Sequence, residues 1–191
     1  ISKALDEIQH VSEVHVVAVA NECKELLLVL EKDSDGSPRF TCVNLLTNQP
    51  TVSFSLEEER NSTVSLSDTV HDFLYEPNAA LLKAGCFKLL TKRYPLSKLH
   101  PNSHLYTSQQ LVAGFPGRVF RVKDWAPYSK KLKKTLLASV NKASITTRNF
   151  PLSSAELRKA LRLAESDENY LFATSLSDDR KVIIQCERIL T

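Results

Sequence analysis

The sequence has few residues of the kinds that build cofactor loops. Its 191 residues include only four glycines, Gly36, Gly85, Gly114 and Gly117. A GxGxxG turn or a Walker loop needs glycines at closer and more regular positions, so neither motif can be built from them. The motifs GxSxG and HExxH are also absent. We therefore expect no catalytic residues and no Gly-rich site for a nucleotide or for S-adenosylmethionine in this chain.

Metal and disulfide frameworks are equally poorly supported. The four cysteines, Cys23, Cys42, Cys86 and Cys186, form no CxxC pair, which argues against a zinc site and against a disulfide scaffold. His100 and His104 lie in the loop sequence HPNSH without a matching second pair of ligands. We expect no metal, and a reducing cytoplasm fits the cysteine usage best.

Long apolar runs and methionine are missing as well. The longest apolar run, residues 26–30, is far shorter than a membrane span, and no signal-peptide pattern is seen, so we expect a soluble protein. The chain starts at Ile1 and contains no methionine, which indicates a fragment of a longer protein. Alternatively, modified methionines are missing from the sequence, and an intact mass equal to 21.5 kDa excludes that alternative.

The charges are unevenly distributed along the chain. Residues 1–72 carry 5 basic and 13 acidic side chains, a net charge of −8, whereas residues 73–117 carry 5 and 1, or +4. Residues 118–191 carry 15 and 8, or +7. A reversal of sign between the two ends indicates surfaces with different partners, and the basic end is the candidate for contact with phosphate groups.

The hydrophobic pattern predicts an α+β fold that begins with a strand meander. Residues 2–9 read as a short helix, and four strands follow in EVHVVAVANECKELLLVLEK, RFTCVNLL and TVSFSL, which we expect to pair as an antiparallel meander. The segment DSDGSP is a turn, and EEERNSTVSLSD reads as a linker. One helix is expected over residues 77–94, and a short strand over residues 105–107.

The last third predicts a small sandwich with two helices on one face of a four-stranded sheet. The expected strands cover residues 118–123, 143–148, 170–175 and 181–189, with a turn at residues 177–179, and the expected helices cover residues 129–141 and 153–163. Ser153 and Glu156 have the spacing of a capping box, and Leu152 and Leu157 that of a hydrophobic staple. Leu157, Ala160, Leu161 and Ala164 are expected to face the sheet.

Cations and aromatic residues gather in this last third. Lysines at the start of a helix oppose its dipole by a few tenths of a kcal/mol each, so helix stability does not explain them, and a polyanion would. A solvated face is the alternative for the cations, and a place in the core is the alternative for Trp125. The candidate nucleic-acid-binding residues are Arg118, Arg121, Lys123, Trp125, Tyr128, Lys130, Lys131, Lys133, Lys134, Lys142, Arg148, Arg158, Lys159 and Arg162.

Four segments, FLYEPNAALLKAGCFKLL, KLHPNSHLYTS, FPGRVFRV and KASITTRNFPLSSAELRKAL, resemble the C-terminal region of bacterial class I S-adenosylmethionine-dependent methyltransferases. The resemblance implies a ferredoxin-like segment at residues 73–117 and a THUMP-like domain at residues 118–191. It further implies that residues 1–72 are the tail of a catalytic domain. The cofactor loop and catalytic residues of these enzymes have no counterpart here, so we expect no activity from this chain alone.

The resulting hypothesis is a non-catalytic C-terminal region that positions structured RNA, either tRNA or rRNA, for a methyltransferase domain in the same protein. S-adenosylmethionine is expected for the full-length protein only. The alternative is an interaction module whose basic face docks on an acidic protein surface or on its own catalytic domain. The sequence does not identify the RNA, the modified base or the oligomeric state.

Overall fold

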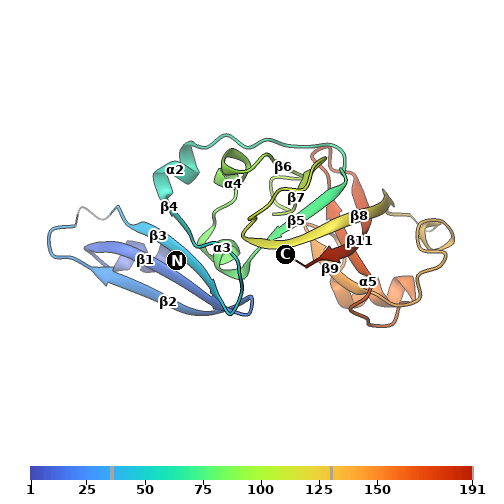
Figure 1. Cartoon of the computed structure of the whole chain (residues 1–191), viewed down its shortest axis with the longest axis horizontal. Coiled ribbons are helices and arrows are strands. Elements are labelled where there is room, and N and C mark those ends of the chain that lie inside the picture. The colour runs from blue at the N-terminus through green and yellow to red at the C-terminus, as the bar shows by residue number, and fades with distance from the viewer. Residues whose placement is uncertain (35–36, 130, 191) are drawn as a thin grey trace. The chain divides into compact units, whose positions relative to one another are not determined.

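Figure 1 shows the computed structural model of the chain, which describes residues 1–34, 37–129 and 131–190. The chain forms two compact units. Unit 1 comprises Ile1–Val64, Pro77–Pro95 and Ala113–Gly117, and unit 2 comprises Ser65–Glu76, Leu96–Val112 and Arg118–Thr191. Both contain helices and a sheet of mixed strand direction, which confirms the α+β fold class.

Unit 1 contains a sheet with the strand order β2-β1-β3-β4. The four predicted strands are confirmed as β1 (Val11–Val19), β2 (Glu22–Leu30), β3 (Arg39–Leu45) and β4 (Val52–Ser55). The antiparallel meander is wrong, because β3 pairs in parallel with β1 instead of following β2. The cause is burial: Val14, Val16 and Ala18 are fully buried and place β1 inside the sheet, whereas β2 carries Leu27 and Leu30 exposed at its edge.

Three helices in unit 1 differ from the expectations. The predicted linker contains α2 (Leu56–Asn61), which begins with a capping box between Ser55 and Glu58. The single helix expected over residues 77–94 is two helices, α3 (Ala79–Ala84) and α4 (Lys88–Arg93). Gly85 separates them with a φ of 80°, a left-handed conformation that ends a helix and that glycine adopts readily.

Unit 1 begins with a short helix. The helix α1 (Ser2–Glu7) confirms the expected short helix. The predicted turn DSDGSP includes residues 35–36, which lie outside the described residues.

Unit 2 is built on a sheet with the order β6-β7-β5-β8-β11-β10-β9. Its strands are β5 (Phe73–Pro77), β6 (Ser97–Lys98), β7 (Tyr106–Ser108), β8 (Gly117–Pro127), β9 (Ser144–Arg148), β10 (Tyr170–Ser175) and β11 (Lys181–Ile189). All four strands expected in the last third are therefore confirmed, and β8 is longer than expected. The expectation of a four-stranded sheet is wrong, because β5, β6 and β7 extend the sheet beyond β8.

The sheet of unit 2 is buried on both faces. One face carries a cluster around Phe120, Tyr170 and Phe172, in which the rings of Phe120 and Phe172 lie 4.8 Å apart. The other face packs beneath α5 (Ser154–Leu161), whose Leu157 and Leu161 are buried. Figure 1 shows this helix beside β9 and β11. A strand with both faces covered reads as a continuous apolar run, which explains why every residue of β10 is buried.

The helix expected over residues 129–141 is wrong. Within its described part, only Leu132–Lys134 form a 3-10 turn, and the remainder is irregular, as the loop after β8 in Figure 1 shows. Leu132, Leu137 and Val140 are the buried residues here, and a gap of five followed by one of three does not follow one helical face. Adjacent lysines also repel one another in a first helical turn.

Among the described residues, no helix is long and apolar enough to cross a bilayer.

Candidate nucleic-acid interface

Two of the predicted arginines meet at one buried carboxylate. Glu76 lies on β5 with a side chain that is 3% exposed. Arg118 on β8 donates from Nε to Oε2 of Glu76 at 2.9 Å and adds a second contact from Nη2. Arg148 at the end of β9 donates from Nε and Nη2 to Oε1, at 3.2 and 2.8 Å. The fold thus joins two predicted site residues that are 30 positions apart in the sequence.

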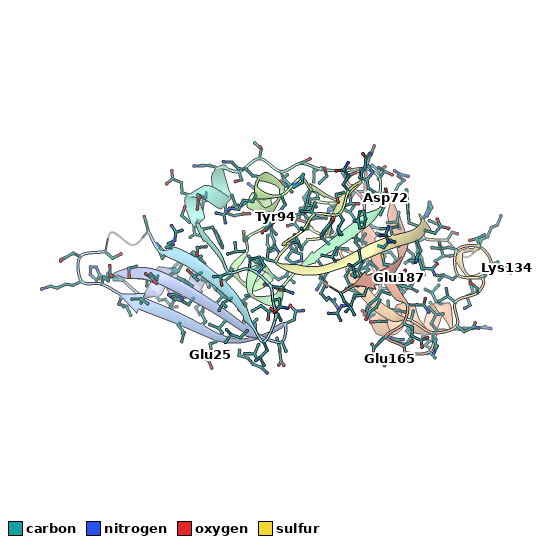
Figure 2. The ribbon with its side chains drawn as sticks, in the orientation of Figure 1. Glu25, Asp72, Tyr94, Lys134, Glu165 and Glu187 are labelled. Carbon is teal, nitrogen blue, oxygen red and sulfur yellow. The ribbon has the colours of Figure 1, made fainter. Side chains whose placement is uncertain are left out.

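The lysine-rich segment 129–141 presents its cations unequally. Lys131 and Lys134 are exposed, and Figure 2 labels Lys134 on this segment. Lys133 is half-buried, because its ammonium group donates to the carbonyl of Val140 and holds the irregular segment closed. Lys130 lies outside the described residues.

Helix α5 presents only part of its predicted basic face. Arg158 folds back, and its Nη1 donates to the carbonyls of Ala143 at 2.9 Å and of Ala164 at 3.1 Å. Lys159 and Arg162 remain exposed. Ala160 and Ala164, expected against the sheet, are also exposed, because α5 ends at Leu161 and Arg162 takes a left-handed conformation.

The cations on β8 and just before β9 have partners within unit 2. Lys123 pairs with Glu187 on β11, and Lys142 pairs with Glu168 at 2.9 Å. The guanidinium of Arg121 lies 5.0 Å from the centre of the Phe73 ring, a cation–π distance. The two ion pairs are exposed, so each is weak and the lysine can exchange its partner for another anion.

The two aromatic candidates lie partly in the core. Trp125 is half-buried against the cluster that contains Phe120, and Tyr128 packs edge-on against Phe150 at 5.2 Å. Tyr128 and Lys133 also line a hollow of about 520 Å³ with Leu161. The lysine-rich segment and α5 therefore border the same hollow.

Histidines and cysteines complete the inventory of reactive side chains. The backbone N–H of Asn102 donates to Nδ1 of His100, which leaves Nε2 to donate to Asp179 at 3.2 Å. Burial raises the pKa of the Cys42 thiol to about 12, and burial also raises the pKa of Cys186. Such thiols are poor nucleophiles. In the part of the chain that the structure describes, no three histidine, cysteine or acidic side chains come together as a metal site.

Comparison with known families and structures gives two domain matches and one close structural relative. Residues 73–116 match the model of a ferredoxin-like domain, and residues 117–188 match a model described as THUMP domain-like. A crystal structure of a "putative methyltransferase" from Porphyromonas gingivalis is 39% identical to the chain, with a TM-score of 0.90. The match covers 98% of this chain and 48% of that protein, so the chain spans about half the length of its relative. No curated protein matches the chain.

Proposed function

We propose that the chain is the RNA-binding region of a methyltransferase and positions structured RNA for a catalytic domain in the same protein. The observation that carries the proposal is the THUMP domain-like match over residues 117–188, which coincides with the strongly basic part of the sequence. The methyltransferase part of the proposal is supported by the relative from Porphyromonas gingivalis. Residues 1–72 would then be the tail of the catalytic domain, and S-adenosylmethionine would bind elsewhere in the full protein.

The exposed cations are the residues suited to bind a phosphate backbone. Lys131, Lys134, Lys159 and Arg162 are exposed and come from two segments that share a hollow. Lysine and arginine side chains that neutralise phosphates release counterions, which gives affinity without sequence preference. The half-buried Tyr128 at the same hollow adds an aromatic ring on which an unpaired base can stack.

A protein partner is the second candidate function, and one observation favours it. Several predicted cations already pair with carboxylates of their own unit, as Lys123 does with Glu187 and Lys142 with Glu168. An acidic protein surface would offer the same chemistry.

The test compares two variants that lose the same charge. In the first, Lys131, Lys134, Lys159 and Arg162 are changed to Gln. In the matched control, four exposed lysines of unit 1, Lys3, Lys24, Lys32 and Lys83, are changed to Gln. Affinity for a structured RNA is measured from about 50 to 200 mM salt, a range over which multi-phosphate binders lose orders of magnitude.

We expect the salt slope of the first variant to shrink by about three units, because each lost phosphate contact removes somewhat under one unit. The control should keep the wild-type slope. Absence of RNA binding by the wild type at the lowest salt would overturn the proposal. Equal affinity for RNA and for an acidic peptide of similar charge would favour the protein partner instead.

A further inference from the structure

The ion cluster around Glu76 has more positive charge than its own neutralisation requires. One arginine suffices to balance one buried carboxylate, yet Arg118 and Arg148 both bind it. The three side chains therefore carry a net charge of +1. A buried charge is costly unless it is paired, so the carboxylate explains one arginine and leaves the second to be explained.

The geometry leaves the same edge of each guanidinium open. Arg118 and Arg148 use only Nε and Nη2 toward Glu76, one arginine on each carboxylate oxygen. Within the described residues, neither Nη1 group donates a hydrogen bond. The side chains of Arg118 and Arg148 are 27% and 38% exposed, whereas the side chain of Glu76 between them is 3% exposed, so solvent reaches both arginine side chains but hardly reaches the carboxylate.

Further contacts support the two arginines, one at the side chain of Arg118 and one at the backbone beside Arg148. The Arg118 guanidinium lies 5.5 Å from the ring centre of the buried Phe120. Arg148 is followed by Asn149, whose φ of 51° turns the chain at the end of β9 and whose carbonyl accepts a hydrogen bond from Ser175 at 2.6 Å. Preorganised donors lose less entropy when they bind an anion.

The surroundings of the cluster remain electropositive. The pKa of His104 is lowered to about 4, first by burial and then by the positive charges of Lys98 and Arg148. The positive charge of Arg148 therefore acts on a neighbouring side chain as well as on Glu76. Close by, Asn149 contacts His100, whose Nε2 is paired with the carboxylate of Asp179.

We propose that Arg118 and Arg148, oriented by the buried carboxylate of Glu76, form a clamp for a single phosphate group, and that in the working protein this phosphate belongs to the RNA backbone. Arginine is suited to this role because its planar fork offers several donors to phosphate oxygens at once. Glu76 is a positioning residue, since it acts only through the two arginines. The assignment of this phosphate to RNA rests on the proposed function, whereas the binding of a phosphate group by the two arginines does not.

The test observes the arginines directly in the whole chain. The Nε–H groups of Arg118 and Arg148 are hydrogen-bonded to Glu76, so their NMR signals are protected from exchange with water and can be followed. The protein is titrated first with inorganic phosphate and then with a structured RNA. We expect both signals to shift together, at low millimolar phosphate and at much lower RNA concentration.

Variants separate a clamp from a simple charge. Arg148→Gln should weaken RNA binding several-fold and reduce the salt slope by somewhat under one unit. Arg148→Lys should bind as weakly as Arg148→Gln, because an ammonium group lacks the planar fork. Arg188→Gln removes an equal charge from an exposed position on β11 and should bind like the wild type. Arg118→Gln gives a second test should Arg148 variants fail to fold.

Each outcome decides one of the two proposals. If RNA binds and neither arginine signal moves, or if Arg148→Lys restores full affinity, the clamp is overturned and the proposed function stands. If phosphate shifts both signals but no RNA binds, the clamp stands as a site for a free phosphate group and the proposed function falls. If neither ligand shifts the signals, the clamp is overturned.

Discussion

Single residues of the same charge have different surroundings in this molecule. Arg158 donates to backbone carbonyls, and Lys159 is exposed. Arg118 and Arg148 bind a buried carboxylate with part of each guanidinium group. Only exposed or outward-facing donors can bind an external anion without breaking an internal contact. The basic residues of unit 2 are therefore not equivalent, and the net charge overstates the binding surface.

His104 gives a pH prediction at this scale. Its pKa is about 4 in the folded protein, whereas a histidine in an unfolded chain titrates near 6.5. Between these values the unfolded state binds a proton that the folded state does not, so the free energy of unfolding falls as the pH drops from about 6.5 to about 4. Above pH 6.5 both states are neutral, and the histidine makes no contribution.

We expect His104→Gln to flatten the pH dependence of the urea midpoint over this window. The wild type measured under the same conditions provides the reference profile. An NMR titration of the His104 ring should have its midpoint near 4. A midpoint near 6.5 would contradict the burial of this side chain.

The elements of the fold depend on caps supplied from near and from far in the sequence. Ser55 with Glu58 and Ser153 with Glu156 form two capping boxes, each within four residues. Helix α4 is capped from a distance, because the carboxylate of Glu59 accepts the backbone N–H groups of residues 87, 88 and 89 at 2.8 to 3.1 Å. Helix α2 therefore also serves as the support that holds Glu59 at the start of α4.

The capping box of α5 yields a stability prediction. Ser153 accepts the N–H of Glu156 at 3.3 Å, and the Glu156 carboxylate accepts the N–H of Ser153 at 2.8 Å. Ser153→Ala should lower the free energy of unfolding by about 1 kcal/mol, because the backbone N–H of Glu156 then loses the side-chain oxygen that accepts its hydrogen bond in the folded protein. Urea denaturation measures the change. Ser139→Ala, at an exposed position outside the helices, should have no effect, and equal values for the two variants would contradict the assigned cap.

The molecule as a whole combines a sheet with an exposed apolar edge and a strongly basic unit. Leu27 and Leu30 on β2 are 51% and 58% exposed. The chain spans about half the length of the relative from Porphyromonas gingivalis, and a larger parent protein stays a proposal. The cytoplasmic location and the domain boundaries at residues 72 and 117 stay predictions.

Binding of S-adenosylmethionine is the prediction that belongs to this scale. Only four glycines are present in the chain, and no Gly-rich turn can form from them. Isothermal calorimetry of the chain with S-adenosylmethionine should therefore show no binding heat. Binding with a micromolar dissociation constant would contradict the assignment of the cofactor site to another part of the protein.

The sequence by itself determined the features that depend on near neighbours. The strands over residues 170–175 and 181–189 are predicted with the bounds that the structure has, because runs of apolar, aromatic and β-branched side chains favour a strand locally. The cap at Ser153 follows from a four-residue motif. The same motif, SLEE at residues 55–58, would have predicted α2, and the polar composition after it concealed the signal.

Only the tertiary structure decided which distant segments meet. Three features depend on burial across the whole chain: the parallel pairing of β1 with β3, the lack of an α-helix in the described part of residues 129–141, and the joining of Arg118 and Arg148 at Glu76. Burial of the Glu76 carboxylate on β5 is costly unless it is paired, and its partners come from β8 and β9. No local sequence pattern shows which arginines these are. The sequence shows which residues are basic, but only the structure shows which of their charged groups are exposed and which are paired.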